Sequence, residues 1–308
     1  MSLSRRSLFK ASAIALAAGA VGSQAPAALA VGPALGTIID FSAGVPSASA
    51  IKAAGHLGAI RYVSQRRPDA QWMKGKPVTL AETKANAAAG LQTASIYQFG
   101  RAETADWLNG AAGAGVHAPQ AIAIHKAAGG PTGRPIYIAI DDNPTHAQYE
   151  KQIRPYLKAF SAALTAAGYQ TGVYGNYNVI DWCVADGIGE FFWMHDWGSG
   201  GKIHPRTTIH QKAKTQATID GITCDINTVY AHDWGQWTPG KGTVSRPKLK
   251  DIPAVPNDAP LPNISLPDPT GRGSSVDGNG ITIAGSSVSN DQVRGAIDVL
   301  NTVRKAMG

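Results

Sequence analysis

Between residues 36 and 230 the chain alternates short apolar runs, bounded by glycine or proline, with Ala-rich amphipathic segments. Such apolar runs are typical of buried parallel strands, and the segments between them are typical of helical crossovers. The sequence predicts eight strands, at residues 37–41, 59–64, 92–97, 135–140, 171–174, 191–195, 207–211 and 222–226. It predicts helices at residues 47–54, 79–89, 104–113, 119–128, 145–167 and 176–185.

Eight strands separated by helices predict an α/β fold, a TIM-like (β/α)8 barrel over residues 31–238. The rival architecture is a doubly wound open sheet, which ranks second because the chain has no G-x-G-x-x-G motif and no phosphate-binding loop. The last crossovers, around residues 198–206 and 212–219, are short or polar. We therefore expect incomplete helices on that side of the barrel.

The first thirty residues have the features of an export signal. The run Ser4-Arg5-Arg6-Ser7-Leu8-Phe9-Lys10 resembles the twin-arginine export motif, and it precedes an Ala-rich apolar stretch and the cleavage signature Ala28-Leu29-Ala30. Residues 1–30 are therefore predicted to be a signal peptide recognised by the twin-arginine (Tat) export machinery. The stretch is too short and too interrupted for a permanent membrane span, so we expect a secreted or cell-envelope protein.

The composition changes after the predicted barrel. Eight of the 19 prolines lie between residues 239 and 270, which predicts an extended linker. Residues 271–308 form a small terminal segment, in which Asp277-Gly278-Asn279-Gly280 predicts a hairpin turn and the apolar spacing at 289–307 predicts a helix.

Charge and cysteine content exclude several classes of protein. The formal charge is +7, but Arg5, Arg6 and Lys10 belong to the predicted signal, and no basic run is interleaved with aromatics, so no nucleic-acid partner is expected. With only two cysteines the chain is neither a disulfide-dense scaffold nor a multi-cysteine zinc protein. Cys183 and Cys224 could oxidise outside the cytoplasm, and the sequence leaves their pairing open.

Acidic residues follow several of the predicted strands. Asp40 ends the first strand, Asp141 and Asp142 end the fourth, Asp196 follows the sixth and Asp225 lies on the last. In a (β/α)8 barrel the chemistry takes place at the C-terminal ends of the strands, so these carboxylates are expected around one mouth. Packed carboxylates raise one another's proton affinity, which gives a site both an acid and a base.

Aromatic side chains are expected at the same mouth, where their faces would stack on sugar rings. About half of them are expected to be ordinary core residues instead. The candidates at or just after strand ends are Tyr62, Trp72, Tyr97, Phe99, Tyr174, Tyr177, Trp193 and Trp197.

The order of five motifs resembles a known family. The motifs are Ile38-Ile39-Asp40-Phe41-Ser42, Asp141-Asp142-Asn143, Gly172-Val173-Tyr174-Gly175-Asn176-Tyr177, Trp193-Met194-His195-Asp196-Trp197 and Cys224-Asp225-Ile226-Asn227. Over residues 36–237 the chain looks like the glycoside-hydrolase-like domain of Tat-exported actinobacterial cell-envelope proteins, a former domain of unknown function related to the family 25 lysozymes. The resemblance implies a TIM-like barrel that acts on peptidoglycan.

The resemblance also assigns candidate catalytic residues. Asp40, Asp141 and Asp225 match aspartates of the family 25 lysozymes, whereas the position of their catalytic glutamate falls on Asn143. An asparagine cannot donate a proton as a carboxylic acid does. Asp142 is the nearest carboxylate, although neighbouring strand residues point to opposite faces.

Three functions follow as hypotheses. In a glycosidase acting on cell-wall polysaccharide, Asp141 or Asp142 would be the general acid, and Asp40 and Asp225 would stabilise positive charge or position a water. The second hypothesis is a non-catalytic carbohydrate-binding envelope protein, which Asn143 favours. The third is a metal-dependent phosphodiesterase using His195 with the aspartates, and it ranks last, so that no metal or cofactor is expected. The expected glycan-binding residues are Asn143, Tyr62, Tyr97, Tyr174, Trp193 and Asp196.

Overall fold

The computed structural model describes residues 31–241 and the backbone of residues 275–277, 280–283 and 286–289. The predicted signal peptide at 1–30, the linker beyond residue 241, and all but the first residue of the predicted helix at 289–307 lie outside the described residues. Three short strands, β9 (Ser275–Asp277), β10 (Gly280–Ile283) and β11 (Ser286–Ser289), pair antiparallel in a separate sheet.

Eight strands close into a barrel in chain order. They are β1 (Gly36–Asp40), β2 (Gly58–Tyr62), β3 (Gln92–Tyr97), β4 (Pro135–Ala139), β5 (Gln170–Gly175), β6 (Phe191–His195), β7 (Ile209–Ile219) and β8 (Ile222–Val229). Consecutive strands from β1 to β7 are parallel, whereas β8 runs antiparallel to both β7 and β1. The closed barrel was predicted, and the reversed last strand distinguishes it from a regular (β/α)8 barrel.

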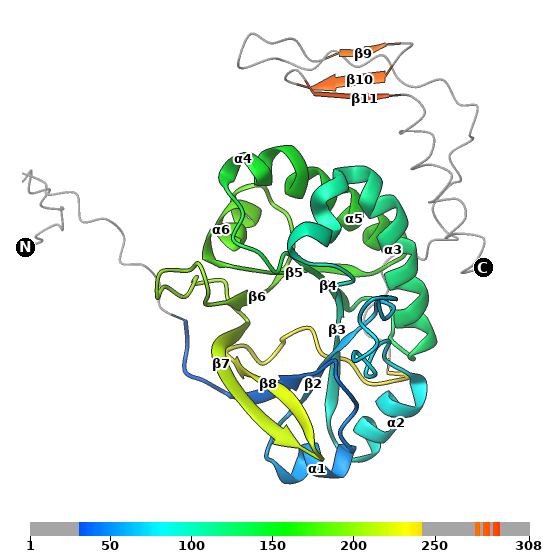
Figure 1. Ribbon diagram of the computed structural model, residues 1–308, viewed down its shortest axis with the longest axis vertical. Coiled ribbons are helices and arrows are strands. Elements are labelled where there is room, and N and C mark those ends of the chain that lie inside the picture. Colours follow the sequence, from blue (N-terminus) through cyan, green and yellow to red (C-terminus); the bar gives the residue numbers. More distant parts are fainter. Residues whose placement is uncertain (1–30, 242–274, 278–279, 284–285, 290–308) are drawn as a thin grey trace, which may run out of the picture.

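Helices connect the first six strands (Figure 1). They are α1 (Ala48–Ala53), α2 (Leu80–Ala88), α3 (Gly110–Ala127), α4 (His146–Gln148), α5 (Arg154–Ala166) and α6 (Tyr177–Ala185), with 3-10 turns η1 (Ala102–Thr104) and η2 (Asp106–Asn109) and the π-helical turn η3 (Tyr149–Ile153). The side chains of Ser47, Thr79 and Asn176 accept backbone N–H groups at the starts of α1, α2 and α6, which satisfies donors that lack helical partners. The helix pair predicted at 104–113 and 119–128 is instead the single helix α3, which accommodates Pro119 in its interior.

The side of the barrel at β7 and β8 lacks helices. The β6–β7 connection contains turns only, and β7 and β8 form a hairpin whose two-residue turn is Asp220-Gly221. Both turn residues have positive φ, 49° and 74°, as a type I′ turn requires. Asp220 accepts hydrogen bonds from the backbone N and side-chain Oγ of Ser47, which hold the hairpin tip against α1 (Figure 1).

Alternation along the strands divides the apolar residues into an interior and an outer layer. Ile38, Ile60, Ile96 and Trp193 fill the barrel, whereas Ile39 and its neighbours pack outward. Both cysteines are buried and free in the outer layer, Cys183 between sheet and helices and Cys224 beneath the β7–β8 hairpin. They belong to different clusters of core residues, so the fold described here contains no disulfide between them.

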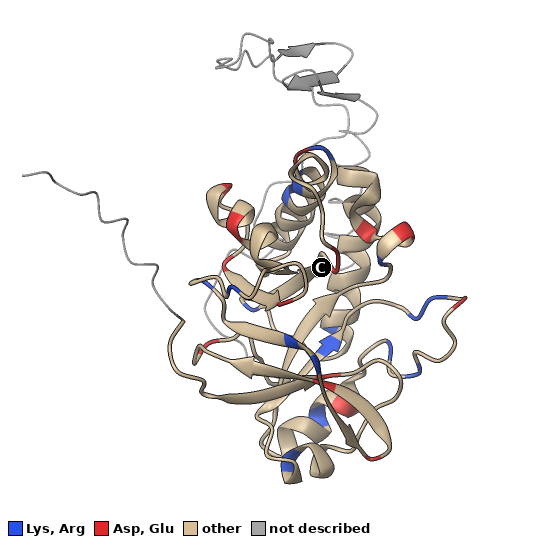
Figure 2. Ribbon diagram, turned by 60° about the vertical axis from the view of Figure 1, so that its left-hand side comes forward, with Lys and Arg blue, Asp and Glu red and all other residues tan. Residues whose placement is uncertain are grey.

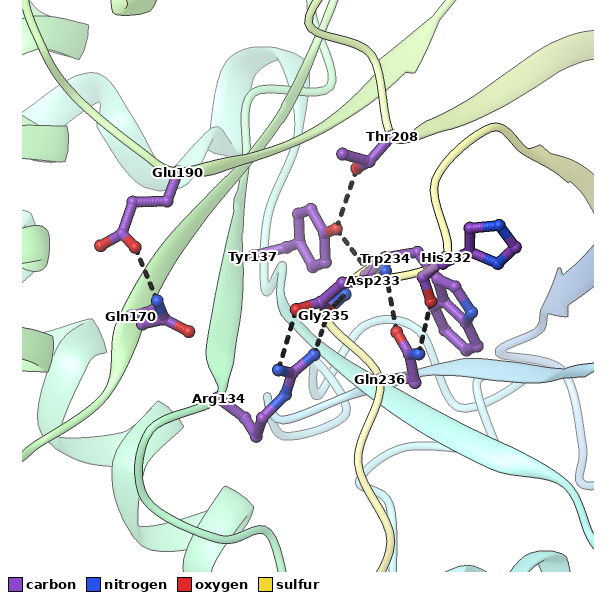
Figure 3. Close-up of polar contacts among 10 residues, drawn as sticks. All are labelled: Arg134, Tyr137, Gln170, Glu190, Thr208, His232, Asp233, Trp234, Gly235 and Gln236. Carbon is purple, nitrogen blue, oxygen red and sulfur yellow. Dashed lines mark hydrogen bonds and ion pairs between the residues drawn. The ribbon is translucent and has the colours of Figure 1, made fainter. Parts of the chain in front are cut away.

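The segment after β8 closes the end of the barrel at which the parallel strands begin. Trp234 is buried with the interior residues, and the Tyr137 hydroxyl donates to the Trp234 carbonyl oxygen at 2.8 Å (Figure 3). Arg134 forms an ion pair with Asp233, and the backbone of Trp237 pairs with that of Thr93 at the start of β3. A cavity lies at the opposite end, at the carboxyl ends of the parallel strands.

In the described part of the chain no helix is long and apolar enough to cross a membrane. Figure 2 shows acidic and basic residues interspersed along the ribbon.

Candidate active site

Three of the predicted aspartates meet at the open end of the barrel. Asp40 is the last residue of β1, Asp141 follows β4, and Asp225 lies on β8 directly opposite Asp40 in the β1–β8 register. Because β8 is antiparallel, its first half lies at the mouth, so Asp225 reaches the site from the beginning of a strand rather than from its end. All three line one cavity of about 1060 Å³.

Asp40 is the most deeply placed of these carboxylates. It is 3% exposed, and it accepts hydrogen bonds from the Tyr62 hydroxyl at 3.2 Å and from Asn227 Nδ2 at 2.8 Å. Burial, and then repulsion by Asp225, raise the pKa of Asp40 from 3.8 to about 7, against the opposing effect of these donors. Asp40 therefore changes charge near neutral pH.

Asn227 was not predicted as a site residue, yet it links two that were. Its Oδ1 accepts from Trp193 Nε1 at 2.9 Å while its Nδ2 donates to Asp40. The indole donor thus fixes the orientation of the amide. Asn227 is two residues after Asp225 on the same strand, so strand alternation from Asp225 could have identified it.

Asp141 lies at the edge of the cavity and is partly exposed. Its Oδ2 accepts from Gln98 Nε2 at 3.0 Å. Burial raises the pKa of Asp141, and the hydrogen bond from Gln98 and the charge of Arg101 oppose that rise. A carboxyl group with an elevated pKa at the rim of an open cavity is suited to proton donation.

The expectation that Asp142 is a second candidate acid is not supported by where its carboxylate points. It accepts from Trp107 Nε1 at 2.9 Å and from the Ala102 backbone N at 3.2 Å, and so holds the chain that follows β3. Asp142 still borders the cavity. The physical reason is alternation, because Asp141 continues the inward side of β4 and Asp142 turns away.

Asn143, at the position of the expected glutamate, is among the residues that line the cavity. Its Oδ1 accepts from Asn176 Nδ2 at 3.1 Å. Gly198 passes so close that a Cβ there would lie 1.9 Å from Asn143 Oδ1. Asn143 is thus held between two neighbouring loops.

Aromatic side chains line the same cavity, and they are Tyr62, Trp72, Phe99, Tyr174, Trp193 and Trp197. Trp72 is 58% exposed and offers a free ring face. The Tyr174 hydroxyl donates to Gln211 Oε1 at 2.6 Å, and its ring lies 4.4 Å from that of Trp193.

Tyr97 and Asp196 do not contribute to the cavity as expected. Tyr97 faces outward from β3, where its hydroxyl donates to Gln120 on α3 and its ring packs against Phe160 on α5. Its neighbour Ile96 takes the inward position, so strand alternation turns Tyr97 away from the barrel interior. Asp196 accepts from the Ala213 backbone N at 3.0 Å and stabilises the start of the irregular part of β7.

His195, the histidine of the metal hypothesis, stacks on Trp197 with ring centroids 4.0 Å apart. Burial lowers the pKa of His195 to about 3, so the ring is neutral. Among the residues that the structure describes, no group of three or more His, Cys, Asp or Glu side chains is arranged to hold a metal ion.

One buried and two partly exposed carboxylates at the open end of a closed barrel, with aromatic rings in the same cavity, are typical of glycoside-hydrolase-like proteins. The chain belongs to the Rv2525c-like, glycoside hydrolase-like domain family, whose model matches residues 49–229. This confirms the family that the order of motifs indicates.

The similar proteins include Rv2525c of Mycobacterium tuberculosis, described as a candidate peptidoglycan hydrolase, which is 46% identical over 242 residues, 77% of this chain and all of that protein. A crystal structure of that Tat-secreted protein with L-tartrate has a TM-score of 0.64 at 47% identity and covers 66% of this chain and all of the solved chain. A Streptomyces coelicolor lysozyme structure matches at 17% identity with a TM-score of 0.41, over 64% of this chain and 93% of the other.

Proposed function

We propose that this protein is an exported glycoside hydrolase that cleaves a cell-envelope polysaccharide such as peptidoglycan. The observation that carries the proposal is that Asp40, Asp141 and Asp225 line one cavity together with aromatic ring faces. Aromatic faces bind the apolar faces of sugar rings, while carboxylates and amides hydrogen-bond to hydroxyl groups. The description of its 46% identical relative as a candidate peptidoglycan hydrolase supports the same class of substrate.

In the proposed reaction Asp141 is the general acid. Its proton passes to the glycosidic oxygen as the bond to the anomeric carbon breaks, and the sugar acquires oxocarbenium character. Asp40 and Asp225, side by side on β1 and β8, stabilise that positive charge or orient the attacking water. The water supplies the hydroxyl group of the new reducing end and returns a proton to the enzyme.

This scheme requires Asp40 to be ionised while Asp141 is protonated. Because the pKa of Asp40 is about 7, the ionised form predominates only above neutral pH. Turnover is therefore expected to change with pH near 7, where Asp40 changes charge, and a pH–rate profile that is flat there would contradict a role for the Asp40 carboxylate.

The test is the Asp141→Asn variant, which should abolish the release of reducing ends from purified peptidoglycan while the protein remains folded. Asp142→Asn is the matched control, since it changes the adjacent carboxylate, which is engaged by Trp107. Wild-type activity in Asp141→Asn would remove the assignment.

Asn143 favours a second candidate function, a carbohydrate-binding envelope protein without turnover, because the amide replaces the expected acid. This candidate predicts binding of glycan strands to the wild type with no product after long incubation. Asn143→Glu would place a carboxyl group in the cavity, and a gain of turnover in that variant alone would favour this second function.

Export through the twin-arginine pathway is also proposed for this chain. Its support is the motif at Ser4–Lys10 and the description of the 47% identical relative as Tat-secreted. Arg5→Lys with Arg6→Lys should leave the protein in the cytoplasm, as measured by cell fractionation.

A further inference from the structure

Basic side chains line the cavity among the acidic ones: Lys214 on β7, and three from the loops after β2 and β3. Arg67 and Lys76 come from the loop after β2, and Arg101 comes from the loop after β3. These side chains face the same cavity as the carboxylates, and none of them has a role in the proposed hydrolysis. The question is therefore which group of a ligand these basic side chains would recognise.

Lys76 is the most unusual of the three. It is 8% exposed, its Nζ donates to the Gln98 carbonyl oxygen at 2.8 Å, and Nζ lies 3.9 Å from the centroid of the Tyr62 ring. No ion pair joins it to a carboxylate in residues 31–241. An ammonium group has three N–H donors, so Lys76 keeps donor capacity toward the cavity.

The loop that carries Lys76 is held in place independently of any ligand. Arg61 is fully buried on β2 and donates to the carbonyl oxygens of Phe41 and of Gly75, the residue before Lys76, at 2.6 and 2.5 Å. Arg61 also pairs with Glu82 at the start of α2. The ammonium is thus preorganised, which lowers the entropy cost of using it for recognition.

Burial of the ammonium is unfavourable and lowers the pKa of Lys76 to about 8, although the charges of Asp106 and Asp40 oppose that decrease. An anion that enters the cavity would relieve this cost. Arg101 supplies a second cation of the cavity lining that has no ion pair within residues 31–241, and its charge acts on Asp141, so it lies near that carboxylate. Arg67 differs, because it already pairs with Asp69 and donates to Thr104.

We propose that Lys76 and Arg101 form an anion subsite beside the aspartates, which binds an anionic substituent of a sugar ring in the glycan. This inference rests on the proposed function, and it narrows the substrate to glycans that carry a carboxylate or a phosphate next to the bond held over Asp141. Hydroxyl groups alone would give the ammonium of Lys76 only neutral hydrogen-bond partners. A charge-assisted hydrogen bond to a carboxylate or phosphate would compensate it.

The experiment compares three disaccharides by calorimetric titration at pH 7 and low salt. They are N,N′-diacetylchitobiose, which is neutral, its phosphate monoester on the primary hydroxyl, and N-acetylglucosaminyl-N-acetylmuramic acid with a free carboxylate. One or both anionic disaccharides should bind the wild type at least about tenfold more tightly than the neutral one, and the tighter of the two identifies the anion. Lys76→Met should remove the preference and leave the affinity for the neutral disaccharide within about twofold.

Lys74→Met is the matched control, because it removes the same charge from an exposed position on the same loop that does not line the cavity. It should keep the preference. Arg101→Met, at an exposed position, is a second variant and should reduce the preference. If the role of Lys76 were only to position Gln98, and through Gln98 to position Asp141, Lys76→Met would weaken the binding of all three disaccharides equally.

Equal affinities of the wild type for the neutral and anionic disaccharides would refute the anion subsite and leave the glycan cleft standing. A preference that survives both Lys76→Met and Arg101→Met would also refute it. Failure of every disaccharide to bind would refute the glycan cleft itself, and the inference with it.

Discussion

The pKa of Asp40 makes a quantitative prediction about stability. Raising this pKa from 3.8 to about 7 means that the fold disfavours the carboxylate, relative to the neutral acid, by about 4 kcal/mol, since one pKa unit corresponds to about 1.4 kcal/mol. Between pH 4 and 7 the unfolded chain has released the proton of Asp40 and the folded chain still holds it. Raising the pH through this window therefore favours unfolding, and Asp40 lowers the free energy of unfolding progressively up to about pH 7.

The perturbation is Asp40→Asn, which removes the ionisation. The amide must face the donors Tyr62 and Asn227, and this adds a cost of about 1 kcal/mol that does not depend on pH. Relative to the wild type, the free energy of unfolding of the variant should rise by about 4 kcal/mol between pH 4 and 8, so that the variant becomes the more stable protein above about pH 5.

The assay is urea denaturation followed by tryptophan fluorescence at pH 4, 5, 6, 7 and 8, with the variant-minus-wild-type difference plotted against pH. Asp69→Asn, at a 69% exposed side chain, gives the baseline for removing a surface carboxylate. Asp225→Asn removes the neighbouring negative charge and should move the window to lower pH, because repulsion by Asp225 helps to raise the pKa of Asp40. A difference between Asp40→Asn and wild type that stays constant from pH 4 to 8 would show that the fold does not disfavour the carboxylate.

Three further substitutions test the assignments at the cavity. Trp72→Ala should weaken binding of chito-oligosaccharides about fivefold or more in calorimetry, because it removes the exposed ring face; unchanged affinity would exclude stacking there. Tyr97→Phe should leave that affinity unchanged and lower the free energy of unfolding by about 1 kcal/mol, because its hydroxyl bonds to Gln120; a loss of binding would return Tyr97 to the site. Gly198→Ala should lower the free energy of unfolding by about 1–3 kcal/mol, and with it the melting temperature. The reason is that Gly198 has a φ of 77° and lies too close to Asn143 for a side chain to fit. An unchanged melting temperature would contradict this.

Much of the barrel follows from the sequence because buried strands are short apolar runs with clear boundaries. The reversed direction of β8 was missed because an apolar run carries no sign of strand direction. The signal was nevertheless present, since Ile219-Asp220-Gly221-Ile222 places an Asp-Gly pair between apolar residues, as in a tight hairpin. Asp225 reached the site only because this reversal brings the start of β8 to the mouth.

The sequence predicts those residues of the candidate site that lie at the carboxyl ends of strands. Asp40 and Asp141 follow directly from that rule, whereas choosing between Ile96 and Tyr97 requires knowing which one faces inward. Lys76 and Gln98 could not have been found in this way, because they lie in loops whose course depends on distant contacts. The position of Lys76 depends on Arg61, a buried cation on the outer side of β2.

Both connections of the barrel to the rest of the chain leave from the closed end. Leu35 bonds to Val229 at the start of β1 and the end of β8, and Trp237 is fixed at the start of β3. A protein that works on an insoluble polymer must bring its cleft flat against that polymer. A fusion partner or a surface attachment joined to the barrel at Leu35 or beyond Trp237 would therefore start from the side away from the polymer. It would leave the approach to Asp40 and Asp141 unobstructed.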